Sequence, residues 1–209
     1  MDILEKLQWR YATKEFDPTQ KITEEKLHRL LEGLRWSASS LGLQAWKVMV
    51  VENPEVRASL VGLSYGQKQV AEASHLLVLC RVNEVDEPYA EDYIDLVSST
   101  RQIPKEELSG YSGMVKGFIN GMADEAKTGW LDHQIYLALG NLLTICAMEE
   151  VDSCPMEGFD KAAVNEVLET AAMGLTAVVM CPVGYRSSAD KYASLAKVRR
   201  PLEEIVIRK

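Results

Sequence analysis

The sequence lacks the close residue spacings that typically mark metal sites and disulfide frameworks. Its three histidines, His28, His75 and His133, share no metal-ligand spacing with one another or with a cysteine. The four cysteines are also widely separated and form no C-x-x-C pair. We therefore expect no metal, and we interpret the cysteines as reduced, small core residues of a cytoplasmic protein: Cys80, Cys146, Cys154 and Cys181.

Long apolar runs and an excess of basic charge are also missing. The N-terminus has no uninterrupted apolar segment of the signal-peptide kind, and the longest apolar stretch, residues 135–148, is broken by Gly140, Asn141 and Thr144. That stretch is shorter than the ~20 residues that span a bilayer. The formal net charge is −8, which argues against a nucleic-acid-binding surface. We predict neither a membrane nor a nucleic-acid partner.

Common catalytic and nucleotide-binding motifs are absent as well. Neither G-x-G-x-x-G nor G-x-x-x-x-G-K-[ST] occurs, so the sequence supports neither a Rossmann site nor an NTPase. The Ser74-His75 pair has no acidic partner at a recognisable spacing, which excludes a hydrolase triad from consideration.

The patterns that are present predict interleaved helices and few strands. Helices are expected over residues 3–10, 24–34, 55–63, 134–151 and 161–169, and strands over residues 46–51, 75–80 and 176–183. Residues 83–133 are charged and carry Pro88, Pro104 and several glycines, which indicates helices joined by loops. The chain is predicted to be one α+β domain over residues 1–209.

Two features indicate a homodimer. The helix at 134–151 is apolar nearly all round and needs more cover than this chain readily supplies. Residues 204–209 alternate like a strand after Pro201 and have no neighbouring strand in sequence, so they could pair with a sheet edge of a second chain.

Basic residues near both ends of the sequence could converge on a phosphate. Arg10 and Lys14 follow the first helix, and Lys197 and Arg199 share one side of an extended segment. Arginine offers paired donors and lysine a point charge, which suits an anion site. The alternative is that all four are ordinary exposed charges. Residues 154–160 could form a loop that a ligand approaches closely. The alternative is a simple connection in which Asp160 caps the next helix.

Seven segments in order resemble the FMN-dependent nitroreductase family, in particular its oxygen-insensitive NAD(P)H nitroreductase and dihydropteridine reductase branch. The matching segments are Arg10-Tyr11-Ala12-Thr13-Lys14-Glu15-Phe16-Asp17, Ser37-Ala38-Ser39-Ser40 with Gln44-Ala45-Trp46, Gln67-Lys68-Gln69 through His75, Gly140-Asn141-Leu142-Leu143, Pro155-Met156-Glu157-Gly158-Phe159-Asp160, Pro182-Val183-Gly184-Tyr185 and Lys197-Val198-Arg199-Arg200-Pro201.

The resemblance implies a nitroreductase-like fold: a central, mostly antiparallel sheet flanked by helices, with the C-terminal strand exchanged between two subunits. It also implies two FMN sites at the dimer interface, with NADH or NADPH as co-substrate. Hydride would pass through flavin N5 in a ping-pong cycle to a nitroaromatic, a quinone or a related flat acceptor. Because the cofactor carries this chemistry, no catalytic side chain is expected.

The same resemblance assigns positions to the cofactor site. Arg10, Lys197 and Arg199 would hold the phosphate, and Lys14 would reach the pyrimidine edge of the ring. Ser39 and Ser40 would come from the other subunit. A backbone N–H of the Glu157-Gly158 pair would bond to N5. The complete set implied is Arg10, Tyr11, Ala12, Lys14, Ser39, Ser40, Gln67, Gln69, Pro155, Met156, Glu157, Gly158, Lys197 and Arg199.

Residues 83–133 match the family least and would form the substrate-side wall. Phe118 and Tyr111 are candidates to stack over the acceptor, with packing into a helical core as the alternative, and Lys116 or Lys127 could meet the 2′-phosphate of NADPH. Gln69 stands where some relatives carry a lysine, which predicts a lower FMN potential here. Other functions left open are a flavin reductase, a non-catalytic FMN-binding protein and a flavin-free dimerisation module.

Overall fold

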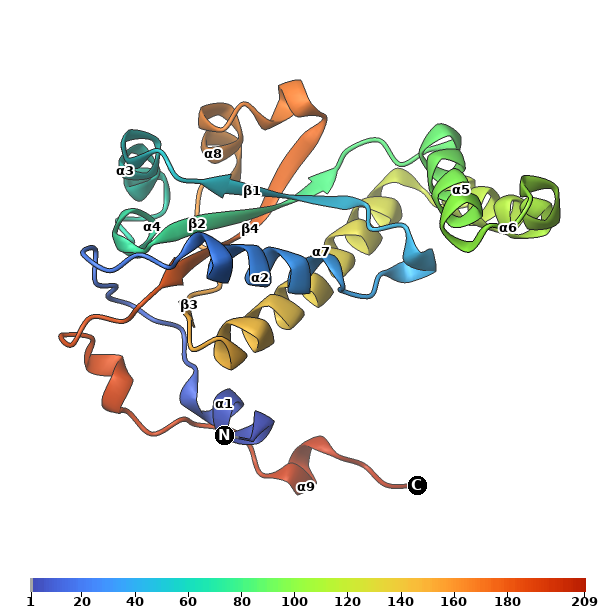
Figure 1. The fold of residues 1–209 in the computed structure, drawn as a ribbon. Helices are drawn as coiled ribbons and strands as arrows, with labels where there is room; N and C mark the ends of the chain where they lie inside the picture. The colour runs from blue at the N-terminus through green and yellow to red at the C-terminus, as the bar shows by residue number, and fades with distance from the viewer. Residues whose placement is uncertain (1) are drawn as a thin grey trace.

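The computed structural model describes residues 2–209. Within that range the sheet has four strands in the order β1-β2-β4-β3, and every neighbouring pair is antiparallel. Helices cover both faces (Figure 1). This confirms the predicted α+β class and the antiparallel sheet flanked by helices. The strands are β1 (Trp46–Val51), β2 (His75–Val82), β3 (Asp152–Ser153) and β4 (Leu175–Gly184).

The helices connect these strands and also form the parts of the chain that extend beyond the sheet. Their bounds are α1 (Ile3–Trp9), α2 (Glu24–Arg35), α3 (Pro54–Leu63), α4 (Gln69–Glu72), α5 (Glu87–Arg101), α6 (Ser109–Asn120), α7 (Asp124–Met148), α8 (Lys161–Val167) and α9 (Leu202–Ile205). Short 3₁₀ turns occur at Ser40–Gly42, Lys105–Leu108, Thr170–Met173 and Lys191–Ser194. Thr23 caps α2 as expected, since its side chain accepts a hydrogen bond from the Lys26 amide.

The central strands β2 and β4 are buried on both faces because each face packs against helices. In β2, Leu76 and Val78 join one core with α3, α4 and α8, whereas Leu77 and Leu79 join another with α2 and α7. The side chains of adjacent residues point to opposite faces, which explains why β2 reads as a continuous apolar run. The sheet is therefore the middle of three layers.

Residues 83–133 form α5, α6 and the first turns of α7, in a lobe that projects beyond the sheet at the end of β2 (Figure 1). A separate small core holds this lobe together, and it includes Val85, Val115 and Leu131. The long helix is α7, which begins at Asp124 rather than near Gln134 and ends at Met148. Its first three turns are largely polar, so the apolar pattern that predicted the helix covers only its later part.

The tail forms no strand in the single chain, and its exchange with a partner subunit stays a prediction. Residues 202–205 form the short helix α9, and residues 206–209 have no regular structure. The segment runs along the exterior beyond α1 (Figure 1), and Ile207 is 83% exposed. A strand needs hydrogen-bonding partners along an edge, and no edge of the chain's own sheet is used by these residues.

Candidate functional site

The two ends of the described chain meet at a cationic pocket. Arg10 directly follows α1, and Lys197 and Arg199 lie on the extended segment after the 3₁₀ turn at Lys191–Ser194. The ammonium group of Lys197 donates a 2.7 Å hydrogen bond to the Leu7 carbonyl and a second to the Arg10 carbonyl, which fixes the segment against α1. The pocket is about 420 Å³ and is lined by Arg10, Tyr11, Ala12, Lys14, Pro155, Tyr192, Leu195, Ala196, Lys197, Val198 and Arg199.

The charge in this pocket is uncompensated. Within residues 2–209 no carboxylate lines it, and the buried Nε of Arg10 has no hydrogen-bond partner. Burial and the neighbouring Arg199 lower the pKa of Arg10, and burial, Arg10 and Arg199 likewise lower the pKa of Lys197. Cations that destabilise one another in this way bind an anion favourably. The structure thus brings together the three residues assigned to a phosphate.

Asp190 joins the two ends of the chain through hydrogen bonds. This side chain is 4% exposed, and its Oδ2 accepts hydrogen bonds from the Tyr11 hydroxyl at 2.9 Å and from the Lys14 amide at 2.8 Å. The same oxygen accepts the Glu15 amide at 3.2 Å, and Oδ1 accepts the Tyr192 amide at 3.0 Å. Burial alone would raise the pKa of Asp190, but these donors together hold it below its ordinary value. Sequence reasoning missed this residue.

Beyond the cations, polar groups surround a buried thiol. Lys14 Nζ lies 3.9 Å from the Sγ atom of Cys154, and Gln69 Nε2 lies 4.0 Å from the same sulfur. Burial raises the pKa of the Cys154 thiol more than Lys14 and Gln69 lower it, so the neutral thiol is favoured. Gln67 Nε2 donates a 2.9 Å hydrogen bond to the Gly158 carbonyl. Lys14, Gln67, Gln69 and Gly158 are therefore neighbours, as the resemblance implies.

The loop 155–158 lies beside Gln67 and Tyr65 and contributes Pro155 to the cationic pocket. A Cβ atom added at Gly158 would lie 3.2 Å from Gln67 Nε2 and 3.7 Å from the Tyr65 ring, so glycine leaves room for these side chains. Met156, by contrast, is buried in the core, and its backbone forms an isolated antiparallel β-bridge with Met180. Glu157 accepts a hydrogen bond from the hydroxyl of Tyr136 on α7.

Tyr65 is a second residue that sequence reasoning missed. It is 72% exposed and has a left-handed backbone, with φ of 55°. An exposed aromatic ring in that conformation is uncommon and suggests a functional constraint. The available signal was its position inside the Ser64-Tyr65-Gly66-Gln67 turn, immediately before the predicted cofactor residues.

Ser39 and Ser40 do not line the cationic pocket of their own chain. Ser39 Oγ accepts the Gln44 amide at 2.9 Å, and the Ser40 amide donates to Gln134 of α7 at 2.7 Å. The expected substrate-side residues also lie elsewhere, on α6. Tyr111 donates a 2.9 Å hydrogen bond to the Leu41 carbonyl, and the Phe118 ring meets Trp130 edge-on with centroids 5.5 Å apart. Tyr111 packs against the core of the lobe, as the packing interpretation expects, whereas Phe118 stays 42% exposed.

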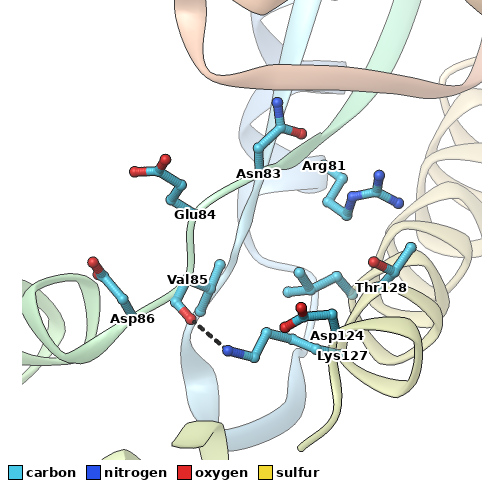
Figure 2. A pocket seen from close by; sticks show the side chains of 9 residues that line it. Arg81, Asn83, Glu84, Val85, Asp86, Asp124, Lys127 and Thr128 are labelled. Carbon is cyan, nitrogen blue, oxygen red and sulfur yellow. Dashed lines mark hydrogen bonds between the residues drawn. The ribbon is translucent and has the colours of Figure 1, made fainter.

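A second pocket, of about 450 Å³, lies where β2 ends and α7 begins (Figure 2). Arg81 and Lys127 line it together with three carboxylates, from Glu84, Asp86 and Asp124. Lys127 donates to the Val85 carbonyl at 3.4 Å, and elsewhere in the lobe Lys116 pairs with Glu91 at 2.5 Å. Both lysines are engaged within the lobe, and a role toward the NADPH 2′-phosphate stays a prediction.

Comparisons with known proteins identify the family of this chain. The sequence model of the Nitroreductase family matches residues 7–185. The chain is 35% identical over 215 residues to the protein named "Putative NAD(P)H nitroreductase YfkO" of Bacillus subtilis, covering 98% of this chain and 96% of the relative. A Staphylococcus epidermidis protein named "Putative NAD(P)H nitroreductase SERP2086" is 36% identical, with coverages of 98% and 95%. The chain belongs to the nitroreductase family.

Solved structures show the same fold. The crystal structure described as the putative nitroreductase ydfN of B. subtilis has a TM-score of 0.88 at 21% identity, covering 99% of this chain and 98% of that one. A putative nitroreductase from Exiguobacterium sibiricum, solved in complex with FMN, has a TM-score of 0.84 at 19% identity, covering 100% and 98%. Within residues 2–209 we find no helix with both the length and the apolar character of a membrane-spanning segment.

Proposed function

We propose that this protein is an FMN-dependent oxidoreductase that uses NADH or NADPH to reduce nitroaromatics, quinones or related flat acceptors. One observation carries the proposal: Arg10, Lys197 and Arg199 converge on a pocket without a carboxylate in the described chain, and Arg10 Nε is buried there without a partner. The names of the relatives at about 35% identity, which specify NAD(P)H and nitroreductase activity, support the same conclusion.

The pocket residues fit FMN. A phosphate monoester would accept hydrogen bonds from the guanidinium groups of Arg10 and Arg199 and satisfy the orphaned Nε atom. It would also relieve the repulsion that lowers the pKa values of Arg10 and Lys197. Lys197 already donates two hydrogen bonds to carbonyls at the C-terminal end of α1. Its role would therefore be both to anchor its own segment against α1 and to supply charge.

The flavin ring would lie toward Lys14, Pro155 and Gln69. Bound FMN supplies reversible two-electron chemistry, which explains why the site needs no acid, base or nucleophile of its own. Lys14 would place a positive charge at the pyrimidine edge and Gln69 a neutral donor. The glycine at position 158 lets the backbone approach a flat ligand, and the exposed Tyr65 lies beside it.

We further propose that the active form is a homodimer. Ser39 and Ser40 lie outside the pocket of their own chain, which is expected if they complete the site of a partner. The surface around them is apolar and open: Trp36 is 73% exposed and Leu137 of α7 is 51% exposed. The tail 204–209 would pair with a sheet edge of the partner. The strand β1 offers such an edge, because it has a neighbouring strand on one side only.

The test is an absorbance spectrum of purified protein, recorded before and after anaerobic addition of NADH or NADPH. We expect a flavin spectrum that bleaches with nicotinamide and returns when a nitroaromatic or quinone is added. Arg199→Gln removes one charge-assisted contact and should weaken FMN binding about ten- to a hundred-fold. Arg200→Gln is the matched control, since Arg200 pairs with Glu204 instead.

Each other outcome contradicts a specific part of the proposal. A colourless protein that binds no added FMN would exclude the cofactor. Tight FMN binding without reduction by either nicotinamide would indicate a non-catalytic binding protein. Turnover of free FMN that exceeds turnover of nitroaromatics would indicate a flavin reductase.

A further inference from the structure

Three chain segments meet on the side of the sheet opposite the lobe and bring together an unassigned group of ligating atoms. Glu24 begins α2, Glu52 follows the end of β1, and His75 begins β2 (Figure 1). One ligating atom from each of these three side chains lies within 4.8 Å of the other two. Sequence spacing could not reveal this group, because its members are more than 20 residues apart along the chain.

His75 is oriented toward the two carboxylates. Its side chain is 9% exposed, and its Nε2 atom lies 3.4 Å from a carboxylate oxygen of Glu52. On the other side of the ring, Nδ1 lies 3.0 Å from Ser74 Oγ, which also accepts the Ile22 amide at 2.9 Å. Among the described residues Nε2 makes no hydrogen bond that meets the usual angular criteria, and it lies close to carboxylate oxygens of both glutamates.

We propose that Glu24, Glu52 and His75 form a binding site for a divalent transition-metal ion of the zinc type. Imidazole and carboxylate are ordinary ligands for such ions, and three protein ligands leave a position for water. The Ser74 hydroxyl oxygen can accept a hydrogen bond from a protonated Nδ1. The lone pair of Nε2 is then free to bind a metal ion.

The geometry requires only movement of exposed side chains. Tetrahedral ligands at zinc lie about 3.3 Å apart, given bond lengths of about 2.0–2.1 Å. The contact from His75 Nε2 to Glu52 already has this length. The remaining separations shorten when the exposed side chains of Glu24 and Glu52 rotate, while the buried imidazole stays in place.

The charges around the ring are balanced. Glu24 and Glu52 face it from α2 and β1, whereas Arg57 donates to the Ser74 carbonyl at 2.9 Å and Lys21 donates to the Ala73 carbonyl at 3.4 Å. Imidazole binds metal ions in its neutral form, through the lone pair of one ring nitrogen. A bound ion would link α2, β1 and β2.

The experiment uses the full chain, stripped with a chelator and titrated with Co²⁺ and then with Zn²⁺. The background carries His28→Asn and His133→Asn, which leaves His75 as the one histidine of the chain. We expect saturable binding of one ion per chain, cobalt absorption bands in the visible region, and a Zn²⁺-dependent shift of the single imidazole signal in ¹⁵N NMR.

Substitutions at the exposed ligands keep the test independent of folding. Glu52→Gln and Glu24→Gln should each weaken Zn²⁺ binding at least tenfold, whereas Glu25→Gln, the neighbouring exposed glutamate, should leave binding unchanged. Failure to bind one ion, or equal binding in Glu52→Gln and Glu25→Gln, would overturn the proposal. The readouts do not depend on FMN or on nitroreductase activity.

Discussion

At the residue scale, the site depends on which polar group each position presents to the cofactor. Gln69 is 5% exposed and places a neutral amide near Cys154, beside the charged Lys14. A cation at this place would stabilise the negative charge that gathers on a reduced flavin. A neutral amide stabilises it less, so in the proposed FMN site Lys14 would supply most of the electrostatic stabilisation on this side.

Gln69→Lys should therefore raise the two-electron potential of bound FMN, by an amount of the order of 30 mV for each 1.4 kcal/mol of added stabilisation. A potentiometric titration of the flavin absorbance measures the change. Gln102→Lys adds the same charge in the distant lobe and should leave the potential unaltered. An unchanged potential in Gln69→Lys would show that this side chain does not act on the ring.

Sequence reasoning located individual residues well where they belong to contiguous motifs. Arg10, Lys14, Lys197 and Arg199 were proposed to converge, and Arg10, Lys197 and Arg199 share one pocket with Lys14. It missed Asp190 and Tyr65, because the four donors of Asp190 come from segments about 180 residues away as well as from its own turn. Such partners become visible only in three dimensions.

At the element scale, Asp190 joins the segment after α1 to the segment that carries Lys197. Asp190→Asn keeps the shape of the side chain but loses the charge and turns one acceptor into a donor. We expect a loss of about 2–3 kcal/mol in the free energy of unfolding at pH 7, together with weaker FMN binding, because both cationic segments lose their common support.

The pH dependence has a defined sign. The folded-state pKa of Asp190 is below the ordinary value of 3.8, so its charge stabilises the fold above that pH, and the stabilisation is lost as pH falls through the folded-state pKa. The difference between wild type and Asp190→Asn in urea unfolding should be constant from pH 8 to about pH 5 and shrink below about pH 4. A difference that grows in acid would contradict this assignment.

The elements with strong local signals were predictable, and those that depend on neighbours were not. The apolar runs predicted β1, β2 and β4, and Thr23 correctly marked the start of α2. The start of α7 was placed ten residues late because the polar turns before Gln134 carry no apolar stripe. The two-residue strand β3 was missed because pairing with β4 alone defines it.

At the scale of the whole molecule, the open apolar surface near the middle of α7 is the feature that a single chain leaves unexplained. Leu137 is half exposed and lines a hollow with Trp36 and Tyr136. Leu137→Asp should convert a homodimer to a monomer, because an unpaired charge in an apolar interface is costly. Light scattering coupled to size-exclusion chromatography measures the mass.

The control is Leu96→Asp, which alters a leucine of similar exposure on α5 in the lobe: 58% against 51%. It should leave the mass unchanged. A wild-type protein that is monomeric at all concentrations, or a Leu137→Asp variant that keeps the dimer mass, would show that another surface, or none, joins the chains.

The position of the phosphate-binding cations has a consequence for biosynthesis. Lys197 and Arg199 are added to the growing polypeptide nearly 190 residues after Arg10. If these residues hold the FMN phosphate as proposed, the cofactor would bind only after both segments have been translated. A product that stops before residue 197 would carry Arg10 without Lys197 and Arg199. Retention of yellow colour would accordingly report that translation has passed this point.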